Sequence, residues 1–183
     1  MMPIAPLMIE HRLIERMIAL LRAEHQRMSQ GAEPDSAFIA TAVDFLRTYA
    51  DRCHHGKEED ILFRDLGNKP LSDDLRQVMD GLISDHAFAR KTVAKLVAAE
   101  ERRRAGDDGA KKDVAECLDG LVEVYSAHIE KEDKHFFLPA MKYFTAQEQD
   151  AMLQEFWGLD RKMIHEKYQG IVKRCEDSRD RAL

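Results

Sequence analysis

Two short motifs place a histidine four residues before a glutamate, His54 with Glu58 and His128 with Glu132. Residues four apart lie on the same face of an α-helix, so each motif presents an imidazole beside a carboxylate. Imidazole nitrogens suit iron, zinc and copper, and a carboxylate can bridge two cations and neutralise their charge. Together the two motifs predict a metal site built on two helices.

Two further histidines, His11 and His86, belong to a weak internal repeat. Each follows an acidic residue, and each precedes one of the motifs by a similar interval, 43 residues to His54 and 42 residues to His128. If each pair of helices forms a hairpin, a rise of ~1.5 Å per residue puts all four histidines ~30 Å from their own turn. They then share one level of the molecule. Four histidines and two bridging carboxylates favour a di-iron site, and the predicted ligands are His11, His54, Glu58, His86, His128 and Glu132.

A second register has the same spacing, because His55 and Glu59 also stand four residues apart. Alignment of the two repeats favours His54 and Glu58, since only these align with the later motif. In that register we interpret His55 as lying outside the site. A single histidine before a glutamate is more often a solvated pair or a packed core residue, so the prediction depends on the combination and its matched spacing.

Other polar and reactive side chains are interpreted as structural. His25 lies about four helical turns from His11, and His135 has no counterpart in the first repeat. Cys53 is rotated by ~100° from its neighbour His54 on an α-helix and is expected to point away from the site. Two tyrosines near the motifs are expected to pack in the core, and these are Tyr49 and Tyr125.

Apolar residues at three- and four-residue spacing predict long helices that hold these side chains. Gly and Pro are few, 9 and 5 in 183 residues, and no segment shows the strict alternation of a strand. The predicted fold class is all-α, an antiparallel up-down four-helix bundle over residues 1–145. An additional C-terminal helix and a charged tail are expected over 146–183. The bundle helices are expected at about 5–29, from a cap at Asp35 or Ser36 to about 66, from a cap at Ser72 or Asp73 to about 104, and from the break at 106–109 to about Pro139 or Tyr143.

The fifth helix has its own start signal. Thr145 followed by Glu148 is a capping-box sequence, which predicts that the helix begins there. Gly158 is expected to allow a kink, and the mostly charged residues from Lys173 onward are expected to fray.

Composition excludes several classes of protein. The net charge of −6, with basic residues interspersed, disfavours nucleic-acid binding. No run approaches 18 apolar residues, so no membrane span is expected, and the N-terminus lacks the basic segment of a signal peptide. Three widely spaced cysteines without a CxxC motif indicate reduced thiols and a cytoplasmic location.

The chain resembles the hemerythrin-like family, the HHE cation-binding domains, over residues 5–142. The resemblance is carried by Glu10-His11-Arg12, by the segment from Cys53 to Phe63, by Asp85-His86, and by the segment from His128 to Asp133 with Leu138-Pro139. It implies a four-helix bundle enclosing two non-haem iron ions with an oxo or hydroxo bridge. It also implies the six ligands given above, with Glu58 and Glu132 bridging the irons.

The sequence departs from the oxygen-carrying members, which have five histidines, two of them close together on the third helix. Here the position four residues after His86 is Arg90. Either one iron keeps an open or water-filled position, or another residue fills it. The candidate is His165, if the fifth helix folds back over the open end of the bundle.

Three functions are compatible with these features. The first is binding or sensing of O₂ or NO at a di-iron centre, with a separate protein partner for any signal. The second is enzymatic or chaperone-like, either detoxification of H₂O₂ or NO, or iron donation for repair of iron–sulfur clusters. The third is a structural or Zn-binding helical bundle without catalysis.

Overall fold

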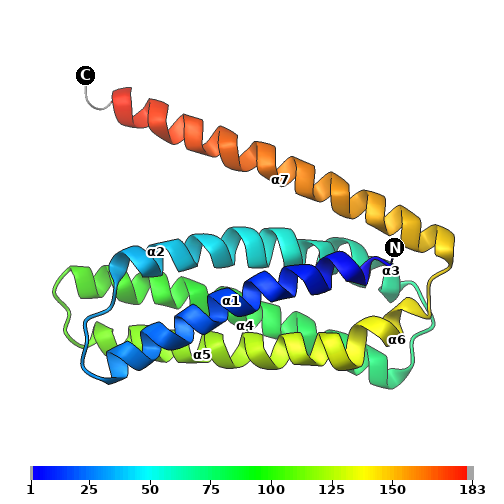
Figure 1. Ribbon diagram of the computed structural model, residues 1–183, viewed down its shortest axis with the longest axis horizontal. Coiled ribbons are helices and arrows are strands. Elements are labelled where there is room, and N and C mark those ends of the chain that lie inside the picture. Colours follow the sequence, from blue (N-terminus) through cyan, green and yellow to red (C-terminus); the bar gives the residue numbers. More distant parts are fainter. Residues whose placement is uncertain (1, 181–183) are drawn as a thin grey trace.

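The computed structural model describes the backbone of residues 2–180 and the side chains of residues 2–163, and its described part contains helices and no strand. Four helical rods form an antiparallel bundle, and a fifth helix follows (Figure 1). The all-α bundle with an additional C-terminal helix is therefore confirmed. The rods are α1 (Ile4–Ser29), the run from α2 (Ser36–Phe45) to α3 (Arg64–Gly67), α4 (Asp73–Arg104), and the run from α5 (Ala110–Lys131) to α6 (Phe137–Met141).

Local sequence signals set the helix boundaries. The Asp35 carboxylate accepts hydrogen bonds from the backbone N–H groups of Ala37 and Phe38, and so caps α2. Ser72 caps α4 in the same way, through the N–H of Leu75. The turns after α1 and α4 each contain a glycine with positive φ, +93° at Gly31 and +96° at Gly106, a conformation that other residues rarely adopt.

The two rods that carry the motifs contain stretches of π-helix. These are η1 (Leu46–His55) and η2 (Glu58–Phe63) in the second rod, and η3 (Glu132–Phe136) in the fourth. In a π-helix each N–H bonds five residues back, so a turn holds more residues and neighbours are rotated by less than in an α-helix. Such stretches are rare and often occur at functional sites.

Two separate apolar clusters fill the core. One lies towards the α1–α2 and α4–α5 turns and includes Leu21, Leu96 and Leu118. The other lies towards the opposite end and includes Leu7, Phe136 and Phe156. A layer of buried polar side chains, described below, belongs to neither cluster, so apolar packing holds the bundle on both sides of that layer.

The C-terminal helix is α7 (Ala146–Asp180). Its start has the predicted capping box, because the Thr145 N–H donates to the Glu148 carboxylate and the Glu148 N–H donates to the Thr145 hydroxyl. It packs on η1 and η2, and Phe156 is fully buried in the second core cluster. The ribbon then separates from the bundle towards its C-terminal end (Figure 1).

The helix passes Gly158 without interruption and its backbone is helical up to Asp180, so the kink expected at Gly158 does not break it, and fraying from Lys173 onward stays a prediction. A glycine only lowers helix propensity, and the hydrogen-bond ladder can continue through it. Within the described residues, no helix has the length and apolarity needed to cross a membrane.

Candidate metal centre

The six predicted ligands come together in one layer of the bundle interior. None of these side chains is more than 2% exposed. α1 contributes His11, the second rod contributes His54 and Glu58, α4 contributes His86, and the fourth rod contributes His128 and Glu132. Four helices that run in alternating directions thus bring residues far apart in the sequence to one level, as the repeat predicted.

The histidines form two pairs that face inward. The Nε2 atoms of His11 and His54 are 3.0 Å apart, and so are those of His86 and His128. Each pair joins a lone histidine to a motif histidine of the same repeat. The two repeats therefore have the same local geometry.

The two glutamates connect these pairs. Glu58 has one oxygen 3.4 Å from Nε2 of His54 and the other 3.4 Å from Nε2 of His86. Glu132 contacts the other member of each pair, because its Oε2 lies 3.1 Å from Nε2 of His11 and 3.3 Å from Nε2 of His128. Each carboxylate thus lies between the two pairs, as a bridging ligand would.

His55 is part of the layer, which corrects our interpretation of it as a residue outside the site. Its side chain is buried, and its ring stacks on that of His86 with the centroids 3.8 Å apart. Ligand-type atoms of His55, Glu58, His86 and His128 lie within 4.8 Å of one another, and those of His11, His54, Glu58 and Glu132 form a second such group. Glu59 instead accepts a hydrogen bond from Nδ1 of His86 at 2.6 Å.

The inward position of His55 coincides with a local change in helix geometry. It ends the π-helical stretch η1, where neighbouring residues are rotated by less than the 100° of an α-helix. Both His54 and His55 can then face the interior. α-Helical spacing did not predict that His55 faces the interior. The only signal in the sequence is the adjacent pair itself, together with the acidic residue four positions before His55, which is Asp51.

Every histidine of the layer donates its Nδ1 hydrogen towards a carboxylate, which leaves Nε2 facing the centre. This arrangement fixes the orientation of a metal-binding imidazole and increases its basicity. Reasoning from the sequence did not identify these outer carboxylates. The pairs are His11 with Asp133 at 2.8 Å, His54 with Glu10 at 2.9 Å, His55 with Asp51 at 3.3 Å, His86 with Glu59 at 2.6 Å and His128 with Asp85 at 3.3 Å.

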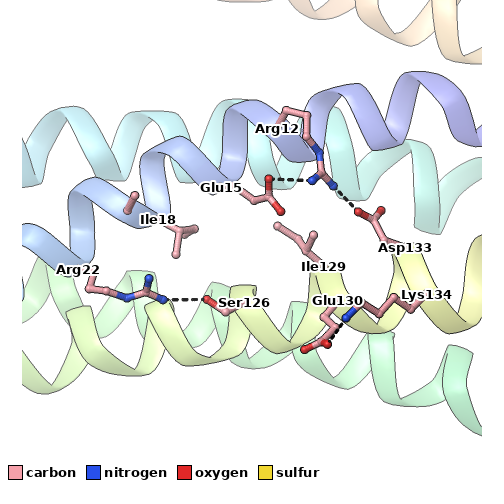
Figure 2. A pocket seen from close by; sticks show the side chains of 10 residues that line it. Arg12, Glu15, Ile18, Arg22, Ser126, Ile129, Glu130, Asp133 and Lys134 are labelled. Atoms are coloured by element: carbon pink, nitrogen blue, oxygen red, sulfur yellow. Dashed lines mark hydrogen bonds and ion pairs between the residues drawn. The ribbon is translucent and has the colours of Figure 1, made fainter.

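Each of these outer carboxylates also forms an ion pair with an arginine or lysine side chain. Figure 2 shows one example, where Arg12 pairs with both Glu15 and Asp133 at the edge of a surface cavity of about 370 Å³ between α1 and α5. Arg90 of α4 similarly pairs with Glu59 and Asp51 of the second rod. The remaining two pairs are Lys57 with Glu10 and Lys131 with Asp85.

The electrostatics of the layer favour cations. Burial disfavours the charged form of His128, but the adjacent Glu132 charge outweighs it and raises the pKa of His128 to about 10. Burial likewise disfavours the charged forms of His11 and His86, but the carboxylates beside them outweigh it and raise their pKa values. Burial would raise the pKa of Glu132, yet the surrounding histidines hold it well below its usual value. His55 is the exception, because burial and His86 lower its pKa.

The donor set fits metal ions. Nε2 of His55 and both carboxylate oxygens of Glu58 and of Glu132 are buried, and they have no hydrogen-bond partner in the described part of the chain. Buried polar atoms of this kind are costly. Moreover, two neutral imidazoles that donate through Nδ1 present lone pairs to each other across 3.0 Å, which requires a proton or a cation between them.

The remaining predicted residues lie elsewhere. His25 is partly exposed and lies 3.6 Å from Asp119, and His135 is exposed. Cys53 points away from the layer, and its thiol donates to Asp160 of α7 at 3.2 Å. Tyr49 stacks on Phe45 and Tyr125 is buried beside His55. The side chain of His165, the candidate seventh ligand, lies outside the described residues.

This fold and this layer define a class of protein, a helical bundle that binds metal through imidazole and carboxylate side chains. The family model of the hemerythrin HHE cation-binding domain matches residues 2–138. The chain therefore belongs to the hemerythrin HHE family. The match covers the four rods of the bundle almost completely and ends before α7. No curated protein and no solved structure shows a significant match.

Proposed function

We propose that this protein is a non-haem di-iron protein that binds O₂ or NO. The observation that carries the proposal is that Glu58 belongs to both groups of ligand-type atoms. A single carboxylate shared by two groups of nitrogen donors suits two metal ions held side by side. Imidazole with carboxylate is a donor set that iron accepts readily.

The two groups differ in their donors, and we assign different roles to them. One ion would be held by His55, His86 and His128, and the other by His11 and His54, with Glu58 and Glu132 shared. The second ion then has one imidazole fewer, which makes it the position for an external ligand. When bound, ferrous ions supply the electrons that O₂ or NO chemistry requires. His55 thus supplies the fifth histidine for which His165 was the candidate.

A cavity adjoins the layer on the side of His55, next to the proposed three-imidazole ion and not next to the ion proposed to bind an external ligand. This cavity of about 290 Å³ lies between η1, α4 and α5, and its lining includes His55, Tyr125, Ala89 and Val93. The exposed Arg90 also lines it, held by ion pairs with Asp51 and Glu59.

The decisive experiment is metal analysis and optical spectroscopy of protein purified from iron-replete cells. We expect two irons per chain, and reversible spectral changes when the anaerobically reduced protein meets O₂ or NO. One zinc per chain, or no metal, would exclude the di-iron proposal. Repeated turnover of H₂O₂ without reversible binding would favour detoxification instead. Transfer of iron to an apo iron–sulfur protein would favour cluster repair.

A further inference from the structure

The C-terminal helix places a charged side chain against the outer shell of the metal centre. Nζ of Lys57 lies 2.6 Å from the Asp160 carboxylate of α7 and also pairs with Glu10 of α1. Lys57 has no exposed surface, which is unusual for a lysine and requires that its charge be compensated. Asp160 supplies part of that compensation from outside the family-matched residues.

From Lys57 the contacts continue to the layer itself. The Glu10 carboxylate that pairs with Lys57 also accepts the Nδ1 hydrogen of His54 at 2.9 Å. Asp160 is therefore joined to a proposed ligand by a continuous chain of charged contacts. Outer partners of this kind fix the orientation of a ligand and affect metal affinity.

The other repeat provides an internal comparison. There Lys131 pairs with Asp85, and Asp85 accepts the Nδ1 hydrogen of His128, which is the same arrangement. The Lys131 side chain is 34% exposed, however, whereas that of Lys57 is 0% exposed. The ion pair with Asp160 of α7 is one difference between the two lysine–carboxylate pairs.

Other contacts hold α7 at this position. Leu159 lies over Gly56, where an added Cβ would be in ordinary van der Waals contact at 3.5 Å from Leu159 Cδ2. One turn earlier, Glu155 forms a two-bond ion pair with Arg64 at 3.0 and 3.1 Å. Glu10, Cys53 and Asp160 form a group of ligand-type atoms, but the Lys57 ammonium contacts two of its three members and already supplies the positive charge.

We propose that Asp160 is a positioning residue for the metal centre, so that docking of α7 and metal binding reinforce each other. Asp160 acts through Lys57 and Glu10 on the orientation of His54. By thermodynamic linkage, the factor by which docked α7 strengthens metal binding is the factor by which metal stabilises docked α7. This inference rests on the proposed function only in requiring that the layer bind metal.

The first test measures Fe(II) affinity anaerobically, by competition with a chromophoric chelator, in the full chain. We expect Asp160→Asn to weaken binding about three- to tenfold, less than the 10–100-fold typical of a direct partner of a ligand. Asp160→Glu should recover most of the affinity. The matched control is Glu155→Gln, which removes an α7 ion pair that does not reach a ligand, and it should stay within about twofold of wild type.

The second test measures hydrogen exchange of residues 146–163 with and without Fe(II). We expect metal to slow exchange in the wild-type chain and to have little effect in Asp160→Asn. Equal affinity losses in Asp160→Asn and Glu155→Gln, or metal-independent exchange in the wild type, would overturn the inference. A wild-type chain that binds no iron would overturn the proposed function as well, whereas iron binding that is unchanged in Asp160→Asn would overturn this inference alone.

Discussion

His54 and His55 are neighbours in the chain, and both imidazole rings are buried in the bundle interior with their centroids 5.8 Å apart. Adjacent residues of an α-helix point in directions 100° apart and seldom share one site. Here the π-helical stretch η1 ends at these two residues. The layer thereby gains a fifth histidine that the repeat cannot provide, because the residue aligned with His55 in the later repeat is Ile129.

We predict that both histidines are required for full metal loading. His54→Ala and His55→Ala should each reduce the bound iron from two ions per chain towards one, because each belongs to only one of the two groups. Elemental analysis of the folded variants, with helicity checked by circular dichroism, measures this. His135→Ala is the control, since His135 is exposed and should leave the iron content unchanged. If the His55→Ala variant still binds two iron ions per chain, His55 is a packing residue and not a ligand.

We predict that the outer carboxylates affect iron affinity almost as strongly as the ligands themselves. Asp133→Ala removes the acceptor for Nδ1 of His11, and we expect iron affinity to fall about 10–100-fold. The control is Glu130→Gln, a neighbour in the same surface cavity that pairs with the exposed Lys134 (Figure 2). Chelator competition should show no change for Glu130→Gln. Equal effects of the two variants would mean that Asp133 acts only through surface charge.

Removal of the metal should destabilise the fold. Binding at a thousandfold excess over the dissociation constant stabilises a protein by about 4 kcal/mol. For a chain of this size that corresponds to a fall in Tm of roughly 10 °C on metal removal. Calorimetry of the loaded and chelator-treated protein measures the difference. His128→Ala, which removes a proposed ligand, should show a much smaller difference, and an equal Tm in both wild-type forms would contradict metal binding by the layer.

The start of α7 should lose stability in acid. Hydrogen bonds from Lys69 and from the Thr145 backbone lower the pKa of Glu148 from an ordinary 4.5 to about 2. A lowered pKa in the folded state means that this stabilisation is fully present above about pH 5 and is lost as the pH falls towards 2. The Tm difference between wild type and Glu148→Gln should therefore shrink over that interval. A constant difference would show that the charge of Glu148 is not involved.

Much of the fold could be predicted from local patterns. Apolar spacing, Asp35, Ser72 and the Thr145–Glu148 box each act through nearby atoms, so the helices begin close to the expected residues. Gly158 was expected to allow a kink, whereas α7 continues through it without a break. Single-residue propensity is weak compared with the cooperative hydrogen bonding of a long helix.

The sequence by itself determined which side chains could meet. His11 and His54 are 43 residues apart and His86 and His128 are 42 apart, and each interval is centred on a turn, so a constant rise per residue puts all four at one level of an up-down bundle. That is why the six predicted residues are found together.

Only the tertiary structure decided how those side chains are oriented and what surrounds them. The inward turn of His55 depends on a π-helical stretch, which spacing alone does not reveal. The outer carboxylates and their cations act between helices, as does the contact of Asp160 with Lys57. Such contacts depend on which faces of distant helices are packed together, and this is set by the bundle as a whole.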